Sequence, residues 1–192
     1  MLLVKDNFLP SDSPILKSLK DKATWQHGFH MEHPETLSEW WDGKEKPSNI
    51  WELLIQEMCA GSKSNCFEYW INILDKNKTL SWHQDKDEHV YTTTGVTNYA
   101  DLSLVYYGYP HVIKGGYIEL AQETDVGDYD YNFKDTERIR PVYNRLVVFQ
   151  PSRFHRVMPI ELGIRYGFQV NVWYNTPQKF IDVKKEKTNE QS

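Results

Sequence analysis

From about residue 66 onward, the chain consists of short runs rich in apolar, β-branched and aromatic residues, separated by turn residues. The predicted strands are 66–74, 81–85, 101–109, 115–121, 144–150 and 165–174. Several short strands at this spacing are typical of a β-sandwich or a β-barrel. The aromatic content of 14% supports a chain with more strand than helix, because aromatic side chains suit pleated surfaces.

The N-terminal third carries helical signals instead. Ser13 is a suitable cap for a helix predicted over 14–23, with a proline in its first turn. Asn49 and Glu52 have the spacing of a capping box for a second helix, predicted over 49–61. We expect these two helices to cover one face of the sheet.

Charge and composition narrow the classes of function. The net charge is -5 and the pI is about 5.8, so the chain has no overall basic field and we expect no nucleic-acid partner. No stretch of 18 apolar residues is present, so we expect no membrane span. Cys59 and Cys66 are interpreted as free thiols of a cytoplasmic protein. The sequence does not decide the oligomeric state.

The stretch SWHQDKDEHV, residues 81–90, holds two histidines and three carboxylates. In a β conformation His83 and Asp85 point the same way, although alone they also fit a solvated turn. His155 follows the predicted strand 144–150 and is the candidate for a third ligand from a distant strand. Two histidines and one carboxylate leave three metal positions open, as in non-haem Fe(II) oxygenases.

Other histidines are rival ligands. His89 follows the charged run, and His111 lies in a turn after a proline, so neither has the strand-turn-strand setting of His155. His27, His30 and His33 are three residues apart, but helical spacing would carry the third away from the first two. We therefore interpret these three as surface residues.

Arg165 begins a strand with a clear period of two. It shares one face with the odd-numbered residues through Trp173, whereas the other face is apolar or aromatic from Tyr166 to Val172. A buried arginine is costly unless an anion meets it, and a dicarboxylate ligand or a salt bridge to an acidic residue would do so. Tyr107, on the same strand face as Ser103, could add a hydroxyl to the same carboxylate.

Several pieces of the chain, in order, resemble one known family. They are Trp82-His83-Gln84-Asp85, LSLVYY, Gly115-Gly116-Tyr117-Ile118-Glu119-Leu120, NRLVVFQPSRFHRVMPI, Arg165-Tyr166 and Val172-Trp173, and they cover roughly residues 66–175. The chain resembles the Fe(II)- and 2-oxoglutarate-dependent oxygenases, and among them the prolyl-hydroxylase-like branch. The resemblance implies a mainly β (α+β) fold, a double-stranded β-helix or jelly-roll, with the N-terminal helices packed on one face.

The resemblance also implies a ligand set. Iron would be held by His83, Asp85 and His155, and the far carboxylate of 2-oxoglutarate by Arg165 and Tyr107, with dioxygen as the second cosubstrate. The expected organisation is a single oxygenase domain over residues 1–182. It comprises helical support to about residue 62, a jelly-roll core over about 63–176, and a flexible tail over 183–192.

Two positions depart from the family pattern. Members often carry a tyrosine about ten residues before the first iron histidine, where this chain has Ile73, and some carry a hydroxyl residue two after the arginine, where this chain has Gly167. Three residues are candidates to replace the missing cosubstrate contacts: Tyr69, Asn72 and Gln169.

The implied activity is hydroxylation of a C–H bond, with a prolyl residue of a peptide or protein as the favoured substrate and a small amino acid as the second choice. A non-catalytic jelly-roll that binds a small molecule or a peptide is the alternative from another class. We expect the acidic stretch 121–143 to be an exposed loop or hairpin. A groove at the mouth of the barrel could form from this stretch and from Trp40, Trp41 and Trp51, or these tryptophans could pack in the core and on the surface. An acidic rim would favour a basic peptide.

Overall fold

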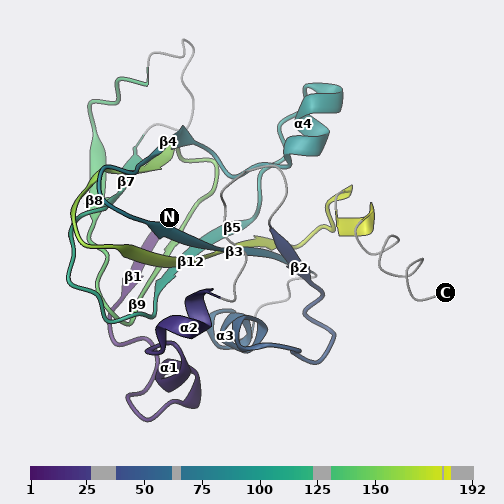
Figure 1. The fold of residues 1–192 in the computed structure, drawn as a ribbon. Helices are drawn as coiled ribbons and strands as arrows, with labels where there is room; N and C mark the ends of the chain where they lie inside the picture. Colours follow the sequence, from purple (N-terminus) through teal and green to yellow (C-terminus); the bar gives the residue numbers. More distant parts are fainter. Residues whose placement is uncertain (27–37, 62–65, 123–130, 179, 183–192) are drawn as a thin grey trace.

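The computed structural model describes residues 1–26, 38–61, 66–122, 131–178 and 180–182. Two antiparallel sheets face each other, as Figure 1 shows, and helices cover the outer face of the larger one. The larger sheet has the strand order β1-β9-β5-β12-β3-β2, and the smaller has the order β4-β10-β7-β8. This is the mainly β, two-sheet arrangement with helices on one side that the sequence predicts.

The strands of the larger sheet are β1 (Leu2–Lys5), β2 (Glu39–Trp41), β3 (Cys66–Leu74), β5 (Leu102–Tyr107), β9 (Arg145–Phe149) and β12 (Arg165–Trp173). Those of the smaller sheet are β4 (Leu80–His83), β7 (Ile118–Ala121), β8 (Thr136–Ile139) and β10 (His155–Val157). A separate pair joins β6 (Lys114–Gly115) to β11 (Ile160–Leu162). The helices are α1 (Pro14–Ser18), α2 (Lys22–Gln26), α3 (Ile50–Met58) and α4 (Glu88–Thr94).

Strand β12 is the centre of the larger sheet, and all of its residues are buried. It pairs with β3 from Arg165 opposite Leu74 to Trp173 opposite Cys66, and with β5 on its other edge. Its even-numbered residues lie in the core beneath the helices, so its odd-numbered residues face the smaller sheet. The division of faces that the period of two predicts is therefore confirmed.

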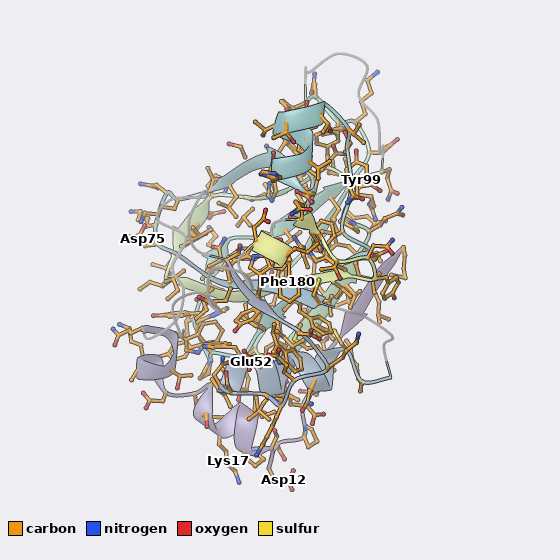
Figure 2. All side chains as sticks on the ribbon, turned by 90° about the vertical axis from the view of Figure 1, so that its right-hand side faces the viewer. Asp12, Lys17, Glu52, Asp75, Tyr99 and Phe180 are labelled. Atoms are coloured by element: carbon orange, nitrogen blue, oxygen red, sulfur yellow. The ribbon has the colours of Figure 1, made fainter. Side chains whose placement is uncertain are left out.

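The helix side of the larger sheet holds the main apolar core. Asn49 caps α3 by accepting hydrogen bonds from the backbone N–H groups of Trp51 and Glu52, at 2.9 Å and 3.0 Å. The helix expected over 14–23 is instead two short helices, because the Trp25 indole donates a hydrogen bond to the Leu19 carbonyl where the chain turns. Figure 2 shows Glu52 on this side, opposite the end of the molecule where Tyr99 and α4 lie.

Two expectations need correction in part, and two lie beyond the described residues. The polar turn after Asp85 soon becomes helix α4, which Asp87 caps by accepting a hydrogen bond from the Val90 N–H at 3.0 Å. Within the stretch 121–143, expected to be an exposed loop or hairpin, residues 136–139 form strand β8, which pairs antiparallel with β7 as a hairpin does, but Ile139 is buried. The tail from residue 183 and the three closely spaced N-terminal histidines lie outside the described residues.

Within the described ranges, no helix is long and apolar enough to cross a membrane.

Candidate functional site

Two histidines and one aspartate meet between the sheets. His83 ends β4 and His155 begins β10, and the two residues lie directly opposite each other across the strand pair. Asp85 follows just beyond β4, where its N–H donates to the Pro151 carbonyl at 3.2 Å. The potential ligand atoms of these three residues all lie within 4.8 Å of one another. Among the described residues no other such group of histidine, cysteine and acidic side chains occurs.

The backbone sets the tautomer of both imidazoles. His83 Nδ1 lies 2.7 Å from the Ser81 carbonyl oxygen, and His155 Nδ1 lies 3.0 Å from the Arg153 carbonyl oxygen. A carbonyl oxygen can only accept, so both Nδ1 atoms carry a proton, and in the neutral imidazoles both Nε2 atoms keep a lone pair. The Nε2 atom of His155 is buried and has no hydrogen-bond partner. The donor set therefore fits a divalent metal ion with open coordination positions.

Neighbouring side chains hold the aspartate. Ser103 on β5 donates its hydroxyl to Asp85 Oδ2 at 2.5 Å, and the Gln169 amide on β12 lies 3.4 Å from the same oxygen. Asp85 Oδ2 also lies 3.5 Å from His155 Nε2. The carboxylate is thus oriented from the larger sheet toward imidazoles that belong to the smaller sheet.

Asp85 and His83 have the charge states that metal binding requires. Burial raises the pKa of Asp85, but the charges of His155 and His83 and the Ser103 hydrogen bond outweigh it and lower the pKa to about 2. Burial, together with the charge of His155, lowers the pKa of His83 to about 4. For His155, burial lowers the pKa, but Asp85 outweighs this effect and leaves it raised. At neutral pH the site therefore offers an ionised carboxylate and a neutral imidazole on His83.

The guanidinium group of Arg165 is a buried cation on the face of β12 that also carries Gln169. Arg165 is only 2% exposed, and its Nη2 donates to the Tyr107 hydroxyl at 2.9 Å. Its Nε has no partner, and no acidic side chain in the described ranges lies within salt-bridge distance of the guanidinium. Burial raises the pKa of Tyr107 despite the opposing effect of Arg165, so the phenol stays protonated. The Arg165 guanidinium and the Tyr107 hydroxyl are therefore two buried hydrogen-bond donors without a compensating anion.

Gly167 explains how Arg165 reaches toward the metal cluster. Arg165 and Gln169 share one face of β12, four residues apart, which corresponds to about 13 Å along a strand. A Cβ on Gly167 would lie 2.9 Å from Arg165 Nη1, so the guanidinium lies over this glycine. The side chain therefore runs along β12 toward Gln169, which contacts Asp85.

The structure separates the remaining candidates. Gln169 and Asn72 are buried on the inner face, the first beside Asp85 and the second opposite Gly167 in the strand pair. Tyr69 lies on the other face: its hydroxyl donates to Glu52 at 3.2 Å, so proposing it as a cosubstrate contact was wrong. Trp41 and Trp51 also pack in the helix-side core, whereas Trp40 lies in a separate cluster with Trp173.

Neither rival histidine joins the cluster. His89 lies exposed on α4. His111 stacks on Tyr166 at 6.3 Å between ring centroids and meets Tyr107 edge-on at 6.5 Å, so it lies beside the arginine instead. Burial, together with the charge of Arg165, lowers the pKa of His111 to about 4, so its ring is neutral. The sequence carried no signal that would place His111 beside Arg165. By contrast, the contact of Ser103 with Asp85 could have been inferred, because Ser103 shares a strand face with Tyr107.

Comparison with known proteins identifies the family. The model of the 2OG-Fe(II) oxygenase superfamily matches residues 69–175, which is more than half of the chain. The comparison with curated proteins finds no match.

Solved structures agree at the level of the fold. A Pseudomonas putida prolyl-4-hydroxylase is similar with a TM-score of 0.61 and 15% identity, over 91% of this chain and 93% of that one. A Trichoplax adhaerens prolyl hydroxylase in complex with a peptide fragment of hypoxia inducible factor has a TM-score of 0.57 and 14% identity, over 95% of this chain and 86% of that one. Streptomyces hygroscopicus HygX with nickel and 2-oxoglutarate has a TM-score of 0.59 and 12% identity, over 92% of this chain and 84% of that one.

The resemblance to the Fe(II)- and 2-oxoglutarate-dependent oxygenases and the expected double-stranded β-helix are therefore confirmed. Because the family model covers more than half of the chain, this protein belongs to the 2OG-Fe(II) oxygenase superfamily, whose members use Fe(II), 2-oxoglutarate and dioxygen.

Proposed function

We propose that this protein hydroxylates a C–H bond of a prolyl residue in a peptide or protein. One atom of dioxygen enters the hydroxyl group, and the other enters the succinate that forms, with carbon dioxide, from 2-oxoglutarate. In this proposal His83, Asp85 and His155 hold the iron, and Arg165 and Tyr107 bind the far carboxylate of 2-oxoglutarate.

The observation that carries the cosubstrate assignment is the uncompensated charge of Arg165. A guanidinium buried without an anionic partner is costly, and a carboxylate can offset the cost with two parallel hydrogen bonds. The Tyr107 hydroxyl accepts a hydrogen bond from Arg165, so its own proton is available to a second acceptor. Both groups are thus arranged for one anion that enters from the side of the metal cluster.

The other residues position and shelter the reaction. Iron, when bound, supplies the activation of dioxygen and the oxidation of the cosubstrate. Ser103 and Gln169 orient the Asp85 carboxylate, and the carbonyl groups of Ser81 and Arg153 keep the Nε2 lone pairs directed at the metal. Apolar side chains between the sheets limit the access of water, among them Val105, Leu120 and Phe149.

Similarity to solved prolyl hydroxylases supports the prolyl substrate. Two of the similar folds carry that activity in their descriptions, and one of them was determined with a peptide. At 15% and 14% identity the likeness concerns the fold, so the prolyl substrate is the part of the proposal that most needs a direct test.

Product analysis tests the proposal. Protein purified without oxygen and loaded with Fe(II) should convert 2-oxoglutarate to succinate when air is admitted. His83→Ala and His155→Ala should each abolish this turnover, whereas His89→Ala, on the exposed helix α4, should retain it. Proline-containing peptides should gain the mass of one oxygen atom. Iron binding without any succinate would contradict the proposal and favour the non-catalytic binding module.

A further inference from the structure

A groove extends from the metal cluster toward helix α4. A hollow of about 360 Å³ is lined by His83 and Asp85, and a second hollow, of about 720 Å³, runs along α4. The two share Glu68, Lys86 and Glu88 in their walls, so they adjoin each other. We call the two hollows together the α4 groove. Figure 1 shows α4 standing apart from α1, α2 and α3, at one end of the sheets.

The α4 groove suits an extended chain. One wall is the inner face of the larger sheet, where Trp40 and Trp173 lie, and the other includes Thr92 and Thr93 of α4. Along β12 the groove runs from Gln169 to Trp173, four residues or about 13 Å. That length accommodates about four residues of an extended peptide. A free amino acid would occupy only the hollow at the metal cluster.

The described residues that line the groove beyond the metal cluster are mainly negative. They are three carboxylates, those of Glu68, Asp87 and Glu88, and one ammonium group, that of Lys86. Lys86 is already engaged: its Nζ lies 3.9 Å from Glu88 and 3.4 Å from the centre of the Tyr91 ring. The Glu88 side chain is 70% exposed, so it remains open to a further cation.

Asp87 supplies an independent indication of a ligand. The residue is only 5% exposed, and its Oδ1 accepts the hydrogen bond that caps α4. Its Oδ2 is buried and has no hydrogen-bond partner. Because the Asp87 side chain lines the groove, its carboxylate adds negative charge to the wall, and this charge favours a cation nearby.

We propose that the α4 groove binds a basic segment next to the residue that is hydroxylated. The substrate is then a peptide or protein with lysine or arginine within about four residues of the target. The position of the target residue in this inference rests on the proposed function. The basic character of the neighbouring segment rests on the charges of the groove.

Binding of matched peptides tests the inference directly. Three fluorescent peptides would share one length and one central proline, and carry four lysines, four glutamines or four glutamates on one side. Anisotropy would be measured without oxygen, on the full chain with Fe(II) and 2-oxoglutarate. The lysine peptide should bind at least about tenfold more tightly than the glutamine peptide at low salt. The difference should shrink at 0.5 M salt, because the screening length then falls well below about 8 Å.

Charge variants locate the effect. Glu88→Lys should weaken the lysine peptide about three- to tenfold, and Glu68→Gln and Asp87→Asn should each weaken it less. Asp87→Asn keeps the oxygen that caps α4, so the helix should persist. Glu57→Lys makes the same charge change as Glu88→Lys, but on the exposed side of α3, and should leave the affinity unchanged. Equal binding of all three peptides, or equal weakening by Glu57→Lys, would overturn the inference.

Failure of the proposed function would look different. Tight, charge-selective binding without succinate formation would retain the groove and reject the oxygenase activity. Hydroxylation of free proline with succinate formation, and no preference among the peptides, would retain the oxygenase activity but reject the peptide substrate and the groove.

Discussion

The guanidinium of Arg165 lies over Gly167, where an added Cβ would come within 2.9 Å of Nη1. The side chain of the arginine therefore occupies the space that a side chain two residues along the strand would need. Some family members carry a hydroxyl residue at the position of Gly167. In this chain a side chain there would collide with the guanidinium of Arg165 as it now lies.

Gly167→Ala should raise the KM for 2-oxoglutarate by between about tenfold and a hundredfold, because the guanidinium must move away from its present position. Steady-state kinetics with varied 2-oxoglutarate measures the effect. Gly61→Ala is the control: a Cβ there meets no atom within 4 Å, but the residue has a φ of +81°, so the change should lower the Tm and leave the KM unaltered. An unchanged KM in Gly167→Ala would show that Arg165 does not hold the cosubstrate.

Tyr107→Phe should raise the KM for 2-oxoglutarate about tenfold, the loss expected for one hydrogen bond to a charged group, with a smaller effect on kcat. Tyr106→Phe removes the neighbouring hydroxyl, which donates to Asn144 at 2.7 Å in the helix-side core. That control should lower the Tm without affecting the KM. If both variants raised the KM equally, Tyr107 would have no specific role.

Ser103→Ala should weaken Fe(II) binding between about tenfold and a hundredfold, because the Asp85 carboxylate loses the hydroxyl that orients it. Anaerobic titration with Fe(II) gives the Kd. Ser48→Ala, which removes a hydroxyl bonded to Glu52 at 2.9 Å, should leave the Kd as in the parent protein. A normal Kd for the Ser103 variant would mean that the remaining contacts are enough to orient the carboxylate.

Glu119 on β7 makes hydrogen-bonded ion pairs with Arg138 on β8 and Arg156 on β10, at 2.8 Å and 2.5 Å. Burial raises the pKa of Glu119, but the two arginines and Thr136 outweigh it and leave the pKa below its ordinary value of 4.5. A lowered folded-state pKa means that the stabilisation is complete above the unfolded-state value and is lost as pH falls through the folded-state value.

Glu119→Gln should therefore lower the free energy of unfolding by about 1–2 kcal/mol at pH 7, since both arginines are partly exposed and solvent screens the pairs. The difference from the parent protein should stay constant from pH 8 to pH 5 and narrow below pH 4.5. Urea unfolding at several pH values measures it. A difference that persists undiminished at pH 3 would exclude the ion pairs as its cause.

The sequence determined those features that depend on local pattern. The period of two in β12 assigned its faces, because side chains alternate along any strand. His83 and Asp85 were selected by the same alternation, and His155 by its place after an apolar strand. The structure brings these three residues together, and it places Arg165 and Tyr107 in contact.

Other features depended on contacts between distant segments. Tyr69 could have faced either side of the sheet until the pairing of β3 with β12 directed it at Glu52. For residues 136–139 the sequence left a loop and a hairpin open, and their antiparallel pairing with β7 decided for the hairpin.

The α4 groove likewise exists only after folding. It combines Glu68 of β3 with Glu88 of α4, two carboxylates that lie twenty residues apart in the chain. The sequence alone indicated a mainly β fold and the ligand candidates, since both follow from residue type and spacing. Only the tertiary structure decided which charges share a surface, because that depends on long-range strand pairing.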